Sequence, residues 1–462
     1  MTATEVPLEP VPDLATSTPN ERLAYGERLR KQISREALGE WEPTSDRPDP
    51  VELLIEQGRS RVPELVPVRY GRMAVSPFTY LRGSPVVMAH DLGTAASTPL
   101  RTQLCGDAHL SNFGSYGTPE RNLIFDLNDF DETLPGPFEW DVKRLVTSIL
   151  VAARTSGQGE KAGRRAARSA ARSYRTNLRR LAEADVLDIW YEHIVLDEAM
   201  ADFAGIVSPK KLAKSIAKAR HRSSAQVLTK LTEVIDGERR IRHQPPVLVP
   251  LDAPEWHDLI ATVIDEYSES MDDDHSQLLS RFHLREVAVK VVGVGSVGTR
   301  CLIALLHGRD EDDVLFLQVK EAETSVLAPY SGDSEYAHQG ERVVVGQRLM
   351  QAASDVFLGW TEGPAGNHFY VRQLRDMKGS VDVDSLPPDG LVVYGELCGR
   401  ALARAHARAA DPLAIAGYLG KPERFDESME AFAIAYADQT ERDHARFLAA
   451  IDAGLITAVP NT

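Results

Sequence analysis

The sequence contains little cysteine and no long apolar run. Three cysteines occur in 462 residues, Cys105, Cys301 and Cys398, and their wide separation shows no metal-ligand spacing. No stretch approaches the roughly 18 consecutive apolar residues of a membrane-spanning helix. The first twenty residues lack the basic start and apolar core of a signal peptide. We therefore predict a cytoplasmic protein with reduced thiols and no membrane partner.

Positive charge is also scarce. Lys and Arg number 52 against 68 Asp and Glu, which gives a formal net charge of −16. An acidic chain is a poor non-specific binder of nucleic acid, so we expect no specific nucleic-acid partner. Hydrophobic residues make up 43% and charged residues 26%, which is ordinary for a folded protein with a core. The oligomeric state cannot be read from these features.

The order of apolar and polar residues predicts an α+β protein with two lobes. Residues 1–20 carry several prolines and no apolar period, so a disordered tail is expected there. Helical spacing dominates residues 21–281 and 379–462, which should form a large helical lobe. Residues 282–378 contain short Val-, Leu- and Ile-rich runs between glycines, which predicts a small antiparallel β lobe.

Individual elements follow from the same spacing. We expect helices at residues 20–41, 138–194, 208–235, 254–279, 335–357, 390–410 and 424–453. Residues 69–92 are also expected to be helical, around a helix start signal at Ser76-Pro77. Strands are expected at residues 100–104, 122–130 and 368–374, and in several runs between 286 and 320. Residues 161–180 are rich in arginine, which favours a solvated helix face, with a surface for an anionic partner as the alternative.

A polar loop follows the first predicted strand. The segment C-G-D-A-H-L-S-N-F-G, residues 105–114, brings Asp107, His109 and Asn112 close together. Phosphoryl transfer to a hydroxyl group needs a carboxylate that orients the nucleophile and oxygen ligands for Mg²⁺. Asp107 suits the first task, and Asn112, five residues later, suits the second. The same residues would also suit a tight turn or a different kind of metal site.

An acidic segment follows the second predicted strand. The run F-D-L-N-D-F-D-E supplies Asp126, Asp129, Asp131 and Glu132. A carboxylate at this place would complete the metal site that Asn112 begins. The order of an aspartate, an asparagine five residues later and an aspartate after a strand is that of protein kinases and aminoglycoside phosphotransferases.

A glycine-rich turn lies in the predicted β lobe. Gly293, Gly295 and Gly298 form a G-x-G-x-x-G pattern, with Ser296 between them. Both dinucleotide-binding folds and kinase phosphate loops use this pattern, but a dinucleotide site needs a helix directly afterwards. Here residues 299–306 read as a strand. We therefore predict a hairpin turn whose backbone N–H groups approach phosphates.

A lysine follows on the third strand of this block. In V-L-F-L-Q-V-K-E, residues 314–321, Lys320 stands at the end of an apolar run. In kinases such a lysine contacts the α- and β-phosphates and pairs with a glutamate on the next helix. Glu341 is the candidate glutamate here. The alternative is that Lys320 only edges a strand and that Glu341 is surface charge.

Several phrases resemble an uncharacterised bacterial domain-of-unknown-function family over about residues 25–450. They are R-M-A-V-S-P-F-T-Y-L-R-G, C-G-D-A-H-L-S-N-F-G, F-D-L-N-D-F-D-E-T-L-P-G-P-F-E-W-D-V-K-R-L and V-G-V-G-S-V-G-T-R-C. In short motifs that family is similar in turn to the protein-kinase-like superfamily, nearest the aminoglycoside and choline phosphotransferases. The resemblance implies a two-lobed kinase-like fold, a cytoplasmic transferase, and ATP and Mg²⁺ as cofactors.

The order of the motifs departs from that superfamily. Kinases place the glycine loop and lysine before the catalytic loop, whereas Asp107 and Asn112 here precede Gly293 and Lys320. Circular permutation accounts for this, because a site depends on spatial assembly and chain termini often lie close together. The segment G-R-A-L-A-R-A-H-A-R, residues 399–408, resembles the helix that normally precedes the catalytic loop.

The resemblance assigns roles to single residues. Asp107 resembles the catalytic aspartate and Asn112 the first metal ligand. For the second metal ligand, N-D-F-D-E resembles the phosphotransferase I-D-F-E segment and favours Asp129, while counting from Asn112 favours Asp126. Asp129 is preferred because Asp141 then takes the place of the buried structural acid on the following helix.

Two function classes follow. The leading hypothesis is a phosphotransferase acting on a small-molecule or protein hydroxyl acceptor that the sequence does not identify, with transfer of AMP from a reversed nucleotide as a variant. The rival is a pseudokinase that binds nucleotide without catalysis. A dinucleotide enzyme is the remaining reading, and a strand after Gly298 would exclude it.

Overall fold

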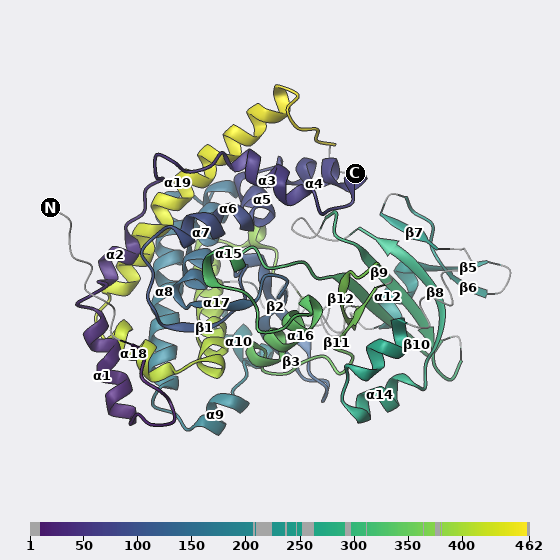
Figure 1. The fold of residues 1–462 in the computed structure, drawn as a ribbon, viewed down its shortest axis with the longest axis horizontal. Helices are drawn as coiled ribbons and strands as arrows, with labels where there is room; N and C mark the ends of the chain where they lie inside the picture. The colour runs from purple at the N-terminus through teal and green to yellow at the C-terminus, as the bar shows by residue number, and fades with distance from the viewer. Residues whose placement is uncertain are drawn as a thin grey trace.

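The computed structural model describes residues 10–206, 208, 224–235, 238–245, 247–251, 263–291, 297–310, 312–363, 365–374, 379 and 381–459. The fold is α+β. A helical region occupies the left of Figure 1 and an antiparallel β region the right. Among the described residues, no helix combines the length and apolar character needed to cross a membrane.

Four long helices build the centre of the helical region: α7 (Glu139–Thr155), α8 (Glu160–Leu181), α17 (Pro388–Ala409) and α19 (Arg424–Asp452). Helix α17 packs along α8, and α19 packs against both α7 and α8. Gly399 permits the close approach of α17, because a Cβ there would lie 2.3 Å from the carbonyl oxygen of Ala170. Residues 139–153 of α7 are buried on all sides, so this helix is the central support of the region.

The two ends of the chain pack together. Helix α1 (Pro19–Leu29) lies against α18 (Pro412–Leu419). Arg47 donates to Asp91 at 2.8 Å and to Asp443 of α19 at 2.7 Å, and all three side chains are less than a tenth exposed. This buried ion-pair cluster fastens the N-terminal segment to the C-terminal helix.

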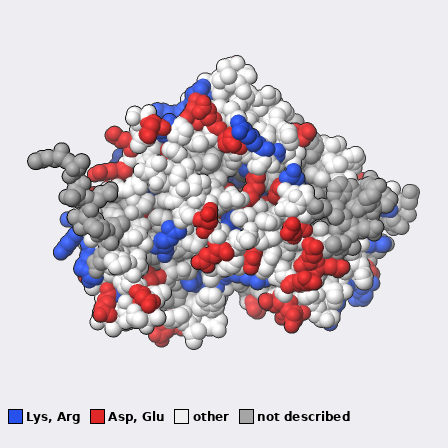
Figure 2. All heavy atoms as spheres, in the orientation of Figure 1, with Lys and Arg blue, Asp and Glu red and all other residues white. Residues whose placement is uncertain are grey.

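The arginine-rich face of α8 is neutralised within the chain. Arg164, Arg168 and Arg172 pair with Glu430, Glu427 and Glu423 around α19. These arginines are 38–62% exposed, so the predicted solvated helix face is confirmed, and its charges also form ion pairs within the chain. Among the described residues on the face shown in Figure 2, acidic and basic side chains are likewise interspersed.

The β region is a six-stranded antiparallel sheet in the order β11-β12-β10-β9-β8-β7. The strands are β7 (Leu248–Pro250), β8 (His283–Lys290), β9 (Cys301–His307), β10 (Val314–Glu321), β11 (Gly359–Glu362) and β12 (His368–Gln373). Apolar side chains cover both faces: Leu315 and Leu317 of β10 join one cluster, and Phe316 joins the other. Helix α16 (Gln339–Met350) packs on β11 and β12 and so lies between the sheet and the helical region.

Two small two-stranded sheets carry the polar loops between these regions. Strand β1 (Arg101–Leu104) pairs with β4 (Leu134–Pro137), and β2 (Phe113–Gly117) pairs with β3 (Leu123–Leu127). Residues 105–112 connect β1 to β2, and residues 128–133 connect β3 to β4. The pairing therefore brings both acidic loops to the same edge.

The remaining elements are shorter. They are α2 (Arg35–Gly39), α3 (Pro50–Gly58), α4 (Val66–Met73), α5 (Pro77–Gly83), α6 (Pro85–Gly93), α9 (Val186–Tyr191), α10 (Leu196–Ala201), α12 (Ser224–Leu231), α14 (Asp273–Leu279), α15 (Ala328–Ser331), β5 (Thr232–Ile235) and β6 (Glu238–Ile241), with 3₁₀ turns at Pro63–Leu65, Leu110–Asn112 and Val383–Ser385.

Most predicted elements are confirmed, with corrections at their ends. The helix predicted at residues 69–92 is three helices, because Ser76 and Ser84 each begin a new helix whose first residue is proline. The helix predicted at residues 20–41 ends at Leu29 and resumes at Arg35. Of the helix predicted at residues 208–235, residues 209–223 lie outside the described residues, and the prediction is wrong at its end, since β5 pairs with β6 there.

Candidate functional site

The loop after β1 is held by a buried acid of α7. The carboxylate of Asp141 accepts the backbone N–H groups of Cys105 at 2.7 Å and Gly106 at 3.0 Å. Gly106 has φ +84°, and a Cβ there would lie 2.2 Å from the carbonyl oxygen of Glu132. His406 of α17 approaches the same Asp141 carboxylate at 3.3 Å. The loop therefore leaves β1 in one fixed direction.

Asp107 is oriented by an arginine of α7. Arg144 donates through Nε at 2.8 Å to Oδ1 of Asp107, and its Nη2 lies 2.6 Å from the same oxygen. His109 Nε2 lies 3.7 Å from the other carboxylate oxygen. Burial lowers the pKa of His109 to about 4, so this imidazole is neutral at neutral pH.

Asn112 lies between Asp107 and Asp129. Its Nδ2 atom donates to the carbonyl oxygens of Asp107 at 3.0 Å and Asp129 at 2.9 Å, and lies 3.2 Å from Cys105 Sγ. Because both acceptors are carbonyl oxygens, the amide nitrogen must face them and the amide oxygen Oδ1 must point the other way. The buried Oδ1 atom is thereby left without a hydrogen-bond partner among the described residues, and it is an oxygen of the kind that Mg²⁺ binds.

Lys320 of β10 reaches the same loops from the sheet. Its Nζ atom forms an ion pair with Asp131 and lies 3.6 Å from Asp129 Oδ1, although 189 positions separate Lys320 from Asp131. Tyr370 of β12 donates to Asp131 at 2.8 Å. Burial opposes the charge of Lys320, but the carboxylates of Asp129 and Asp131 outweigh it and raise the pKa of Lys320 above its usual value. The amine is therefore a permanent cation.

The four predicted residues Asp107, Asn112, Asp129 and Lys320 thus gather in one place, but Glu341 does not join them. Within the described chain Glu341 forms no ion pair with Lys320, so the expected lysine–glutamate pair is wrong in this structure. Helix α16 instead turns Arg342 toward the loop, where it donates to the carbonyl oxygens of Asp131 and Thr133. The nearer acids of the loop after β3 have taken the place of the helix glutamate.

Asp126 is occupied elsewhere. It is fully buried, and Arg404 of α17 donates to both of its carboxylate oxygens at 2.6 and 2.7 Å. The backbone N–H groups of Leu127 and Ala352 also donate to this carboxylate, each at 2.9 Å. Asp126 therefore ties β3 to α17 and the end of α16, whereas the Asp129 side chain is 41% exposed.

The glycine segment is described only in part. Gly293, Gly295 and Ser296 lie outside the described residues. Gly298 has φ +94°, and its carbonyl oxygen accepts the backbone N–H of Val62 at 2.8 Å. Strands β8 and β9 on either side pair antiparallel, so the segment joins two neighbouring strands. The strand β9 after Gly298 excludes the dinucleotide arrangement, which needs a helix there.

Sequence reasoning missed the arginines that surround the site. Arg144 orients Asp107, and Arg372 of β12 donates to the carbonyl oxygen of Asn128 at 3.2 Å and to Gln318 at 3.1 Å. Their partners lie on other elements, and no spacing along the chain relates them. The phrase W-D-V-K-R-L contains Arg144, but the pattern gives it no role.

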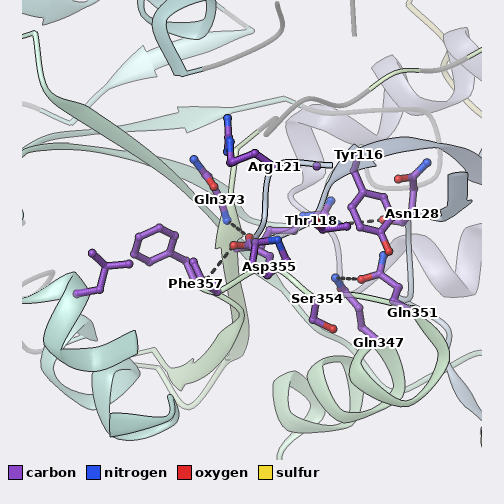
Figure 3. A pocket seen from close by; sticks show the side chains of 15 residues that line it. Tyr116, Thr118, Arg121, Asn128, Gln347, Gln351, Ser354, Asp355, Phe357 and Gln373 are labelled. Carbon is purple, nitrogen blue, oxygen red and sulfur yellow. Dashed lines mark hydrogen bonds between the residues drawn. The ribbon is translucent and has the colours of Figure 1, made fainter. Parts of the chain in front are cut away.

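Two cavities flank the loop of residues 128–133. One, of about 380 Å³, is lined by Arg61, Asp131, Glu132, Thr299 and Glu323. The other, of about 330 Å³, is shown in Figure 3, where Tyr116, Asn128, Gln347 and Asp355 face it from β2, the loop after β3, α16 and the loop after α16. Polar groups from both the sheet and the helical region thus face open space on either side of Asp129.

A comparison with known protein families confirms the resemblance to an uncharacterised bacterial family. A family described as an uncharacterised protein conserved in bacteria, DUF2252, matches residues 61–450. The chain belongs to this family. No curated protein and no solved structure matches it. The region that DUF2252 covers includes Asp107, Asn112, Asp129 and Lys320, so the whole polar cluster lies within the family's own sequence.

Proposed function

We propose that this DUF2252 protein is an ATP- and Mg²⁺-dependent phosphotransferase with a circularly permuted, kinase-like arrangement, acting on a hydroxyl acceptor. The observation that carries the proposal is the approach of Lys320 Nζ to 3.6 Å from Asp129 Oδ1, beside Asn112. A buried cation held between two carboxylates, with the unpartnered amide oxygen of Asn112 on the adjoining loop, is what a bound, metal-neutralised polyphosphate needs.

Lys320 and the backbone of the glycine segment would hold the phosphates. Asn112 Oδ1 and Asp129 would hold Mg²⁺, which supplies charge neutralisation to the transferring phosphoryl group when bound. Two protein ligands are sufficient, because Mg²⁺ completes its shell with water and substrate phosphates. This agrees with the described residues containing no group of three or more His, Cys, Asp or Glu side chains suited to a metal.

Asp107 would orient the acceptor hydroxyl and receive its proton. Arg144 binds one oxygen of the carboxylate, so the carboxylate cannot rotate freely. The neutral His109 beside the other oxygen contributes no competing positive charge. A positioned base of this kind is worth roughly 10²- to 10⁴-fold in rate.

The strand order supports a kinase-like arrangement. The glycine segment joins β8 to β9, and the lysine stands on β10, the third strand of the same antiparallel run. In kinases the glycine loop likewise precedes a lysine on the third strand.

Permutation is supported by the end of α17. Its His406 lies beside β1: Thr102 Oγ1 is 3.5 Å from the carbonyl oxygen of His406, and His406 Nε2 approaches Asp141. The helix that would precede the catalytic loop in a kinase therefore adjoins that loop here, although it comes from the other end of the chain.

The test follows the fate of labelled ATP. The protein is incubated with Mg²⁺ and either γ- or α-labelled ATP, alone and with pools of metabolites, and Asp107→Asn is compared with the exposed control Asp188→Asn. We expect γ-label to be transferred, Asp107→Asn to bind ATP and lose at least 100-fold in turnover, and the control to match the parent. Transfer of α-label would indicate AMP transfer, and a Mg²⁺-dependent thermal shift without transfer would indicate a nucleotide-binding pseudokinase. Equal turnover by Asp107→Asn and the parent would remove Asp107 from the mechanism.

A further inference from the structure

One arginine beside the candidate site has a guanidinium with no hydrogen-bond or ion-pair partner among the described residues. Arg82, in the last turn of α5, makes no hydrogen bond or ion pair with any described residue, and its Nε atom is buried. The side chain as a whole is partly exposed, and its guanidinium lies 5.9 Å from the ring centre of Phe78. A partly desolvated cation that is not hydrogen-bonded to a counter-ion is costly, so a partner from outside the chain is expected.

Neighbouring contacts place Arg82 beside Asp107. Arg144, which binds Asp107, also donates at 2.7 Å to the carbonyl oxygen of Leu81, the residue directly before Arg82. Burial lowers the pKa of Arg82, and the carboxylates of Asp107 and Asp129 oppose that shift. Both acids are already engaged, Asp107 by Arg144 and Asp129 by Lys320. The guanidinium of Arg82 therefore carries a positive charge that no ion pair among the described residues of the site balances.

The chemistry of the side chain limits the partner. A guanidinium presents planar, forked N–H donors that match the oxygens of a phosphate or a carboxylate. We propose that Arg82 binds an oxyanion of the substrate, a phosphate or carboxylate group, next to the hydroxyl that Asp107 orients. That the oxyanion belongs to a substrate rests on the proposed function, whereas the anion site itself rests only on the environment of Arg82. The oxyanion belongs either to the acceptor or to the terminal phosphate of the nucleotide.

The first experiment needs no nucleotide. Binding of inorganic phosphate is measured by calorimetry for the parent, Arg82→Gln, Arg82→Lys and the exposed control Arg281→Gln. We expect the parent and the control to bind alike, Arg82→Gln to bind about 10- to 100-fold more weakly, and Arg82→Lys to retain part of the affinity. Arg82→Gln should melt no lower than the parent, because it removes an unpaired, partly desolvated charge.

A second experiment separates the two sources of the oxyanion. Phosphate is titrated in the presence of Mg²⁺ and a non-hydrolysable ATP analogue. Binding alongside the analogue assigns Arg82 to the acceptor, and competition assigns it to the terminal phosphate, which Arg82→Gln should then confirm by weakening ATP but not AMP. Absence of phosphate binding by the parent, or equal binding by Arg82→Gln, overturns the proposal, as does a failure of both Arg82 variants to fold. Loss of ATP binding alone would count against the proposed function and leave the anion site standing.

Discussion

The carboxylate of Asp141 accepts the backbone N–H of Cys105 at 2.7 Å, and this contact fixes the start of the loop that carries Asp107. The same carboxylate accepts the N–H of Gly106 and is approached by His406. One helix residue therefore positions the start of this loop. Substitutions at Asp141 should therefore disturb the conformation of this loop more than the rest of the fold.

Asp141→Asn replaces one acceptor oxygen with an amide that cannot accept a hydrogen bond. We expect it to lower the free energy of unfolding by about 2 kcal/mol and to reduce transfer from ATP, because the loop loses one anchor. Urea denaturation and the labelled-ATP assay measure the two effects. The exposed Asp188→Asn is the control, and a parent-like result for Asp141→Asn in both assays would contradict the anchoring role.

Lys320→Met removes the cation between Asp129 and Asp131. We expect a loss of about 3 kcal/mol in the free energy of unfolding, because two partly buried carboxylates then face each other without compensation. ATP binding should be lost as well. Adding Asp131→Asn should restore much of the stability and none of the ATP binding, which calorimetry and denaturant melts together resolve. Lys230→Met, at an exposed position of α12, is the control; equal stability of Lys320→Met and the parent would disprove the coupling.

His109 should make stability depend on pH. Burial lowers its folded-state pKa from 6.5 to about 4, so folding favours the neutral imidazole. The stability that this provides is present above pH 6.5 and is lost as the pH falls toward 4. His109→Gln should remove this pH-dependent part of the free energy of unfolding, which amounts to roughly 3 kcal/mol between the two pH values. His193→Gln, at an exposed position, should leave it unchanged. Denaturant melts at several pH values test this, and parallel curves for parent and His109→Gln would refute it.

Arg47→Leu should be among the most destabilising changes of a charged residue. It leaves Asp91 and Asp443 buried without their shared cation, at a cost of about 3–5 kcal/mol in the free energy of unfolding. Arg59→Leu removes a pair with Glu56 in which both side chains are about two-thirds exposed or more, and it should cost less than about 1 kcal/mol. Thermal and urea melts compare the two variants. Similar losses would mean that burial does not govern these pairs.

The sequence predicted what local spacing controls. Asp107 and Asn112 share a short loop, and the glycine segment is followed by a strand that its short apolar run predicted, so these features were found where they were expected. The helix start at Pro77 was expected from the Ser76-Pro77 pair, whereas the second break, before Pro85, was missed. Short strands such as β4 and β11 have four residues each, too few to show a period.

Partners that come from distant parts of the chain were beyond sequence reasoning. Lys320 was expected to pair with Glu341, but the rotation of α16 about its own axis decides which side chain faces the loop after β3, and that side chain is Arg342. The choice between Asp126 and Asp129 stayed open from spacing alone. It is Arg404, on a helix near the C-terminus, that occupies Asp126.

The anchoring of Asp126 by Arg404 and of Asp141 by His406 has a consequence for biosynthesis. Both anchors belong to α17, one of the last helices to emerge during translation. The loops that carry Asp107 and Asp129 therefore cannot form all of their native contacts until almost the whole chain has left the ribosome. A truncated product that stops before α17 would be released with its polar loops unsupported, ready for capture by chaperones or proteases.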